Sequence, residues 1–129
     1  MIESWRHKTI WAYEKPIDFR KQVNGLIQTV IDESEAGLDR ESIYLFRNQG
    51  RNRLKILLWD RNGFFMGYKR LEKGKFDFPT DEPQVQFTWE EFEQLLSGMP
   101  IVLLKSQKKR MVYWHHHQKE PKNNFSPHR

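Results

Sequence analysis

Alternating apolar and polar side chains in the middle of the chain predict three consecutive strands. They cover residues 42–48, 53–60 and 64–72. A period of two is typical of strands that turn one face towards a core. The dipeptide Asn62-Gly63 favours a tight hairpin between the last two strands, because a type I′ turn needs positive φ at both central residues. These three strands are therefore expected to form an antiparallel meander.

Shorter segments rich in β-branched and aromatic residues predict further strands around this meander. They cover residues 9–13, 76–79, 85–87 and 101–104. Pro79 closes the second of these segments, and residues 85–87 are short enough to serve as an edge strand. With some of these short segments added, the antiparallel sheet is expected to have about four to six strands, which is the usual size.

Two stretches have the apolar spacing of amphipathic helices. Between residues 19 and 31 the apolar side chains follow at spacings of 4, 3, 1, 3 and 1. This periodicity predicts a helix of about four turns that begins near Asp18 and ends before Gly37. Residues 88–98 begin with a capping box and end with a glycine, which predicts a second helix. The sequence therefore predicts an α+β fold, an antiparallel β-meander with two helices packed on one face.

Length and composition limit the organisation of the chain. With 129 residues it can form one domain with a modest core, and residues 1–114 are expected to form a single globular α+β domain. Residues 115–129 are rich in proline, asparagine and charge and are expected to be a disordered basic tail. Early charged residues do not fit a signal peptide, and no apolar run could span a bilayer. A cytoplasmic protein without a membrane partner is therefore expected.

Positive charge is concentrated in the middle of the chain. The net charge is +5, yet residues 42–75 hold nine basic and two acidic side chains, whereas residues 76–104 hold six acidic and no basic ones. A basic surplus favours polyanionic partners such as nucleic acid or an acidic protein. Residues 108–110 form a further basic cluster, which would act either as a DNA arm or as part of a solvated tail.

The strand predicted over residues 53–60 has two chemically different faces. Its core face consists of Leu54, Ile56 and Leu58. Its other face carries Arg53 and Lys55 together with Trp59. Cations between exposed rings would suit phosphates and unpaired bases, but exposed lysines and arginines on a sheet also serve solubility and edge protection. Both interpretations remain open at this stage.

No group of residues predicts catalysis, a bound metal or a cofactor. Carboxylates are scattered and lack the spacing with which two-metal nucleases hold ions about 3.5–4 Å apart. Asp60 and Glu72 come from neighbouring strands and could meet, so a metal-dependent nuclease is kept as a third alternative. The adjacent residues His115–His117 do not converge on one ion, and the absence of cysteine excludes a thiolate site.

Motifs in a fixed order resemble a known family. The segment Lys15–Leu26 contains Pro-x-Asp-Phe-Arg-Lys, and the segment Tyr44–Pro79 contains Phe-Arg-Asn, Arg-Leu-Lys, Trp-Asp-x-x-Gly and Lys-Arg-Leu-Glu-x-Gly. Together with the short capped helix, they resemble the small TnpB-type accessory protein of the bacterial insertion-sequence 66 transposons. The resemblance implies a role in transposition beside a transposase and a second small accessory protein, with transposon-end DNA as a further partner. Gln22 and the residues from Met99 onward depart from the family pattern.

Two compatible functional hypotheses follow. The first is a non-catalytic accessory protein of DNA transposition that binds nucleic acid. Its candidate contacts are Arg20, Lys21, Arg47, Arg51, Arg53, Lys55, Trp59, Lys69, Arg70, Lys73 and Lys75. The alternative is a protein-protein adaptor that docks on the transposase without DNA contact. Its candidate contacts are Trp89, Glu90, Glu91, Phe92 and Glu93.

The first two nucleic-acid candidates are expected in the first turn of the long helix. There Arg20 and Lys21 would either be solvated or pair with Asp18 or Glu14, or they would share an anion with the helix N-terminus. The sequence leaves open whether the DNA is single or double stranded, and it leaves the oligomeric state open.

Overall fold

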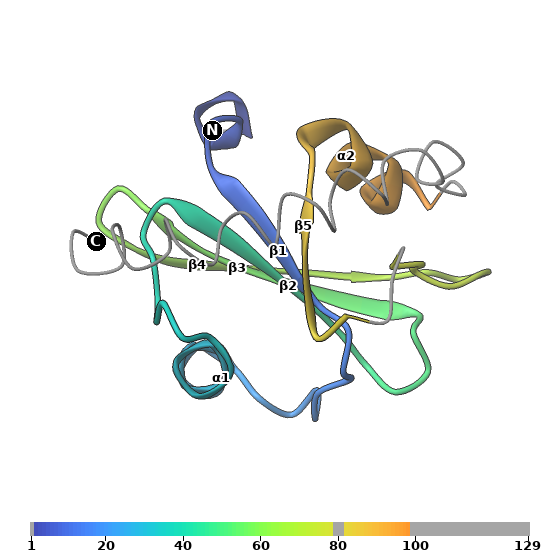
Figure 1. Ribbon diagram of the computed structural model, residues 1–129. Coiled ribbons are helices and arrows are strands. Elements are labelled where there is room, and N and C mark those ends of the chain that lie inside the picture. Colours follow the sequence, from blue (N-terminus) through green and yellow to red (C-terminus); the bar gives the residue numbers. More distant parts are fainter. Residues whose placement is uncertain (1, 79–81, 99–129) are drawn as a thin grey trace.

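A five-stranded sheet with a helix on each face forms the core of the computed structural model, which describes residues 2–78 and 82–98 (Figure 1). In spatial order the strands are β4 (Gly63–Arg70), β3 (Arg53–Asp60), β2 (Ser42–Arg47), β1 (Thr9–Tyr13) and β5 (Gln84–Phe87). The helices are α1 (Val23–Glu33), α2 (Trp89–Ser97) and a short 3₁₀ helix (Ile2–Trp5). The predicted α+β class and the number of strands are confirmed.

The sheet is mixed. Strands β2, β3 and β4 form the predicted antiparallel meander, and β5 pairs antiparallel with β1. Strand β1 lies parallel to β2, contrary to the expectation of a purely antiparallel sheet. The connection between them explains this. Residues 14–41 contain α1 and carry the chain back to the end of the sheet at which β1 began, as parallel pairing requires.

The two helices pack on opposite faces of the sheet, so the prediction that both lie on one face is wrong (Figure 1). One core joins α2 to the sheet and includes Ile43, Leu45, Leu54, Phe92 and Leu95. The other joins α1 to the sheet and includes Leu26, Val30, Tyr44, Phe46 and Leu57. The reason lies in β2, which is buried at every position. A strand that is apolar on both sides needs cover on both sides.

Helix α1 begins at Val23, later than the sequence pattern suggested. Asp18 shapes a turn before the helix instead of capping it, and its carboxylate accepts a hydrogen bond from the backbone N–H of Arg20 at 2.9 Å. The helix ends at Glu33, and Gly37 adopts φ 76° in the turn that follows. The segment before the helix is thus a loop, and Lys55 of β3 donates to its carbonyls at Phe19 and Lys21.

The hairpin between β3 and β4 turns one residue earlier than predicted. Asp60 pairs with Gly63, so the turn residues are Arg61 and Asn62. Arg61 has φ 58°, and the N–H of Asn62 donates to the carbonyl of Asp60 at 2.6 Å. A hydrogen bond between residues two apart with positive φ at the middle residue is the rarer, strained form of γ-turn.

Helix α2 confirms its sequence signals. The Thr88 hydroxyl accepts from the N–H of Glu91 at 3.1 Å, while the Glu91 carboxylate accepts from the N–H of Thr88 at 2.7 Å. This reciprocal pair is the predicted capping box. Gly98 ends the helix in the left-handed region, with φ 78°.

Residues 76–78 do not form the fourth strand of the meander, contrary to expectation. Phe76 is instead buried in the core on the α2 face, and its N–H donates to the carbonyl of Arg51 at 2.7 Å. The strand expected at 101–104, the basic cluster at 108–110, His115–His117 and the expected domain limit at 114 lie outside the described residues.

Candidate nucleic-acid interface

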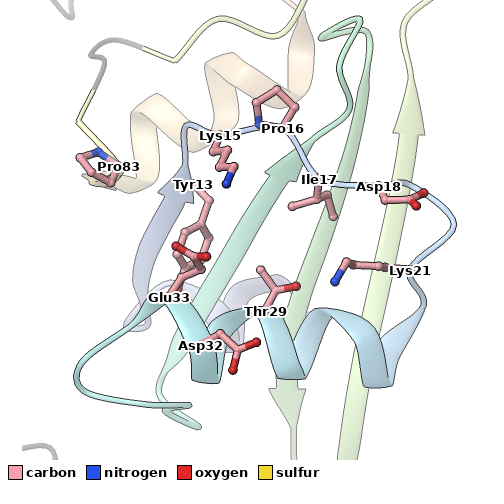
Figure 2. A pocket seen from close by; sticks show the side chains of 10 residues that line it. All are labelled: Tyr13, Lys15, Pro16, Ile17, Asp18, Lys21, Thr29, Asp32, Glu33 and Pro83. Carbon is pink, nitrogen blue, oxygen red and sulfur yellow. The ribbon is translucent and has the colours of Figure 1, made fainter.

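A pocket of about 290 Å³ lies between the end of β1, the segment after it and one side of α1 (Figure 2). The charged groups in its walls are Lys15, Asp18, Lys21, Asp32 and Glu33. Tyr13 also lines the pocket, where burial raises the pKa of its phenol. Because two lysines face three carboxylates, the pocket is not built for a polyanion. A surface for a polyanion must therefore lie among the remaining cations.

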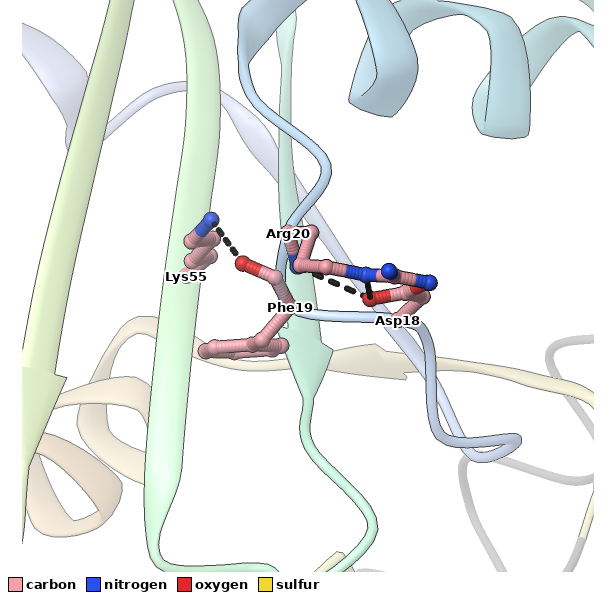
Figure 3. A network of polar contacts seen from close by, with 4 residues as sticks. All are labelled: Asp18, Phe19, Arg20 and Lys55. Atoms are coloured by element: carbon pink, nitrogen blue, oxygen red, sulfur yellow. Dashed lines mark hydrogen bonds and ion pairs between the residues drawn. The ribbon is translucent and has the colours of Figure 1, made fainter.

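Arg20 lies in the loop before α1 and is bound to Asp18 (Figure 3). Its guanidinium approaches the carboxylate to 2.6 Å, and both side chains are exposed. Hydrogen bonds from Arg20 lower the pKa of Asp18 to about 2. The structure thus shows the pairing with Asp18 that the sequence offered as one alternative, and not a shared anion site on a helix N-terminus. Lys21 follows in the same loop and is exposed.

Lys55 is buried, so the expectation that it lies on an exposed sheet face is wrong. Its Nζ donates to the carbonyl of Phe19 at 2.9 Å (Figure 3) and lies 4.9 Å from the centroid of the Phe19 ring. It also donates to the carbonyl of Lys21 at 2.6 Å. Burial lowers its pKa. Lys55 therefore anchors the loop that carries Arg20 and Lys21, and it is not itself available to a phosphate.

Arg47 is also withdrawn from solvent, with 2% of its surface exposed. Its guanidinium donates to the carbonyl of Phe76 at 2.8 Å and to the Glu14 carboxylate at 3.3 Å, and it lies 3.8 Å from the centroid of the Phe78 ring. Burial lowers its pKa, and the neighbouring charge of Arg51 acts in the same direction. Arg47 ties the sheet to the segment after β4, which excludes it as a surface contact.

Five of the predicted cations lie at one end of the β3–β4 hairpin, on the ends of the two strands and the adjoining loops. We call this surface the basic end, and it consists of Arg51, Arg53, Arg70, Lys73 and Lys75, all exposed. Backbone hydrogen bonds hold its two loops together. The N–H of Leu71 donates to the carbonyl of Asn52 at 2.8 Å, and the N–H of Phe76 donates to that of Arg51 at 2.7 Å. Residues some 20 positions apart in the sequence therefore form one surface, as strand pairing requires.

Two arginines stand directly opposite each other at the basic end. Arg53 in β3 is paired with Arg70 in β4, and like charges in this position destabilise a sheet. Glu72 lies 3.2 Å from Arg70 and offsets part of the repulsion. Glu14 stands 3.9 Å from Arg51 in a similar way. A bound anion would relieve the repulsion between the two arginines.

Tyr68 is a feature of this surface that was not among the predicted site residues. It is 53% exposed, which makes it one of two exposed large apolar residues in the described part of the chain. It pairs with Lys55 and lies on the same face of β4 as Arg70. The Phe19 ring flanks it at a centroid distance of 6.2 Å. Strand alternation indicated the shared face, but it did not show that α1 leaves this ring uncovered.

Trp59, the predicted stacking residue, lies at the other end of the hairpin. Along β3 it is about 20 Å from Arg53, given a rise near 3.3 Å per residue. The Arg40 guanidinium lies 4.2 Å from the centroid of its ring, and Phe64 meets it edge-on at 5.1 Å. Trp59 is therefore engaged within the fold.

Lys69 belongs to the opposite face of the sheet from the basic end arginines. It pairs with Leu54 in the register of β3 and β4. Its Nζ donates to the carbonyl of Leu96 in the last turn of α2. A cation at this position complements the negative end of the helix dipole. Lys69 thus joins α2 to β4, and the structure does not bring it to the predicted nucleic-acid surface.

The predicted partner surface on α2 is smaller than expected. Phe92 and Glu91 are buried, one in the core and the other in the capping box. Trp89 is partly buried against Phe92, and the Arg6 guanidinium lies 5.3 Å from the centroid of its ring. Of the five candidates, Glu90 and Glu93 are exposed. Burial at every third or fourth position is what an amphipathic helix requires.

The described residues contain no group of three or more histidine, cysteine or acidic side chains placed to hold a metal ion. Asp60 and Glu72 do not meet, because one lies at the hairpin turn and the other beyond the opposite end of β4.

None of the helices within residues 2–78 and 82–98 has the length and apolar character needed to cross a membrane.

Fold and surface together define a small α+β protein with an exposed cationic end, and comparison with known proteins places it further. The family described as "IS66 Orf2 like protein" matches residues 8–106. "Uncharacterized protein y4jC" of Sinorhizobium fredii (strain NBRC 101917 / NGR234) is 34% identical over 106 residues, which are 81% of this chain and 91% of that protein. No solved structure matches. The chain belongs to the IS66 Orf2-like family, which indicates an accessory role in transposition.

Proposed function

We propose that the protein is a non-catalytic accessory factor of transposition that binds DNA through the basic end. In this proposal it acts in the cytoplasm beside a transposase and a second small accessory protein. The family supports the setting in transposition. The DNA contact rests on the chemistry of the surface, since lysine and arginine neutralise phosphates and release their counterions.

The observation that carries the proposal is the pair of arginines placed opposite each other. Arg53 and Arg70 face each other across β3 and β4, although like charges in this position weaken the sheet. Buried cations elsewhere in the fold are each matched by a carbonyl or a carboxylate, as Arg47 and Lys55 are. At the basic end one carboxylate, Glu72, pairs with Arg70, and no ion pair of Arg53 is found among the described residues. A phosphate between them would convert this repulsion into binding energy.

The direct test is DNA binding by the Arg53→Glu variant, measured by gel shift and fluorescence anisotropy at about 50 mM salt and above. Reversal of one charge should lower affinity about tenfold or more, because it removes a phosphate contact and adds a repulsive one. The slope of log affinity against log salt should fall by about 0.7–0.9 for each phosphate that the variant no longer neutralises.

Arg61→Glu is the matched control. It makes the same change of charge at the other end of the same hairpin, where Arg61 is also exposed. If DNA binds at the basic end, the Arg61→Glu variant should bind DNA nearly as well as the wild type does. Equal losses in the two variants would show that only net charge matters. No binding by the wild type at low salt would refute the proposal.

We further propose that the exposed side of α2 contacts the transposase. Glu90 and Glu93 lie there in a segment without basic residues, and acidic groups suit a basic partner. Co-purification should be lost in the double variant Glu90→Lys/Glu93→Lys, which leaves the capping residue Glu91 in place. Retained binding in this variant would refute the contact.

A further inference from the structure

The exposed ring of Tyr68 beside the basic end bears on whether the bound DNA is single or double stranded. We infer that the surface binds an unpaired DNA strand, with Tyr68 as the platform on which a base stacks. This inference rests on the DNA binding proposed above and specifies its substrate. Its starting point is the exposure of Tyr68, 53%, on a face where the preceding side chains of β4 are covered.

The core under α1 covers this face of β4 only as far as Met66, two residues before Tyr68. Phe64 and Met66 lie on the same face of β4 and pack against the core under α1. Two residues further on, Tyr68 has the Phe19 ring on one flank, tilted by 53° at 6.2 Å. Within the described residues its hydroxyl makes no hydrogen bond. The ring is therefore held at its side and open to solvent, as a stacking platform must be.

Hydrogen bonds anchor the loop on one side of the Tyr68 ring. Lys55, which stands opposite Tyr68 in β3, holds the carbonyls of Phe19 and Lys21 at 2.9 and 2.6 Å. This anchor fixes the loop whose ring flanks Tyr68 and which carries the exposed Lys21. On the other side Arg70 follows two residues along the strand, about 7 Å away. A platform preorganised in this way loses little entropy when it binds.

This combination favours a single strand over a duplex. Base pairs in a duplex cover each other's faces, so a ring on a sheet surface finds no base to stack on. An unpaired strand presents both its phosphates and the faces of its bases. Cations alone would bind either form of DNA. The exposed Tyr68 ring between the cations is the feature that would favour single-stranded over double-stranded DNA.

Fluorescence anisotropy of the full chain with three labelled probes tests the inference. The probes are a strand of about 20 nucleotides, the duplex of the same sequence and an abasic strand with the same phosphates, each longer than one binding site. Tyr68→Ala should weaken binding of the normal strand about tenfold, because stacking is lost. Binding of the duplex and of the abasic strand should change less than about twofold.

Two further variants make the result specific. Tyr68→Phe keeps the ring and should bind the normal strand as the wild type does. Ile31→Ala truncates the other exposed apolar residue, which lies on α1, and should leave all three probes unaffected.

Equal losses on all three probes, or no loss for Tyr68→Ala, would overturn the inference. In that case Arg53→Glu should still weaken every probe, and the proposed DNA binding would stand alone. If the wild type binds none of the probes at low salt, both the inference and the proposed function fail.

Discussion

The two ends of the β3–β4 hairpin combine the same kinds of side chain, yet they differ in what those side chains contact. At the turn end the ring of Trp59 is covered by Arg40 on one side and by Phe64 at its edge. At the basic end Tyr68 is half exposed, and Arg53 and Arg70 face each other. The ring at the turn end is thus covered by an arginine of the fold, whereas the ring and the opposed arginines at the basic end face solvent.

This difference shows what marks a binding surface in a small basic protein. A cation near a ring is common and stabilises a fold when the two meet each other, as Arg40 and Trp59 do. A binding surface instead contains groups whose strongest partners are absent from the fold. By that criterion the basic end, and not the turn end, is the candidate interface.

The largest expected effect is on stability, and it should distinguish the buried Arg47 from the exposed Arg51. Arg47→Leu should lower the free energy of unfolding by about 3 kcal/mol, because it leaves Glu14 and the Phe76 carbonyl without their donor. Arg51→Leu, an exposed control, should change stability by less than about 0.5 kcal/mol. Urea unfolding measures both, and similar values for the two would contradict the assignment.

The two rings should show opposite effects. Trp59→Ala should lower stability by about 2 kcal/mol through poorer packing and leave DNA affinity unchanged. Tyr68→Ala should leave the melting temperature nearly unchanged, since its ring is exposed. Thermal melting beside anisotropy measures both quantities. A loss of strand binding in Trp59→Ala at a temperature where it is folded would contradict the comparison.

The opposed arginines predict that binding and stability conflict at the basic end. Arg53→Glu places a carboxylate opposite Arg70 and should raise the free energy of unfolding by up to about 1 kcal/mol while it weakens DNA binding. Arg53→Gln should give a smaller gain. If Arg53→Glu is less stable than the wild type, the two arginines do not repel each other as described.

The smallest effect concerns the pair formed by Asp18 and Arg20. Because the folded pKa of Asp18 is about 2, below its usual 3.8, the pair stabilises the fold above about pH 4, and this contribution is lost as the pH falls towards 2. The melting temperature of Asp18→Asn should therefore fall less between these pH values than that of the wild type. Glu93→Gln, which removes an exposed acid on α2, serves as control. An identical fall in wild type and Asp18→Asn would refute the pair's role.

Local signals predicted much of the fold. The alternation in residues 53–60 placed β3, and the capping box placed α2, because both patterns depend on neighbours in sequence. The side of the sheet on which each helix packs, and the parallel pairing of β1 with β2, depend on how residues 14–41 cross the sheet. No local pattern in the sequence contains that information.

The candidate site was predictable in part for the same reason. Alternation correctly placed Arg53 and Lys55 on one face of β3. Whether each is exposed depends on the loop that carries Phe19, which crosses one of them and not the other. Likewise, Arg47 is buried because residues 76–78 fold over it. Segments that are distant in the sequence therefore determine which cations are buried and which stay exposed to a partner.

Mapping of backbone amide NMR shifts during titration with single-stranded DNA tests the central claim most directly. The basic end is predicted to respond, with the largest shifts at Arg51, Arg53, Tyr68, Arg70 and Lys73. Amides near Trp59 and Arg61 at the turn end should stay within the noise. Shifts that centre on the turn end or on α2, with the basic end unchanged, would contradict the account.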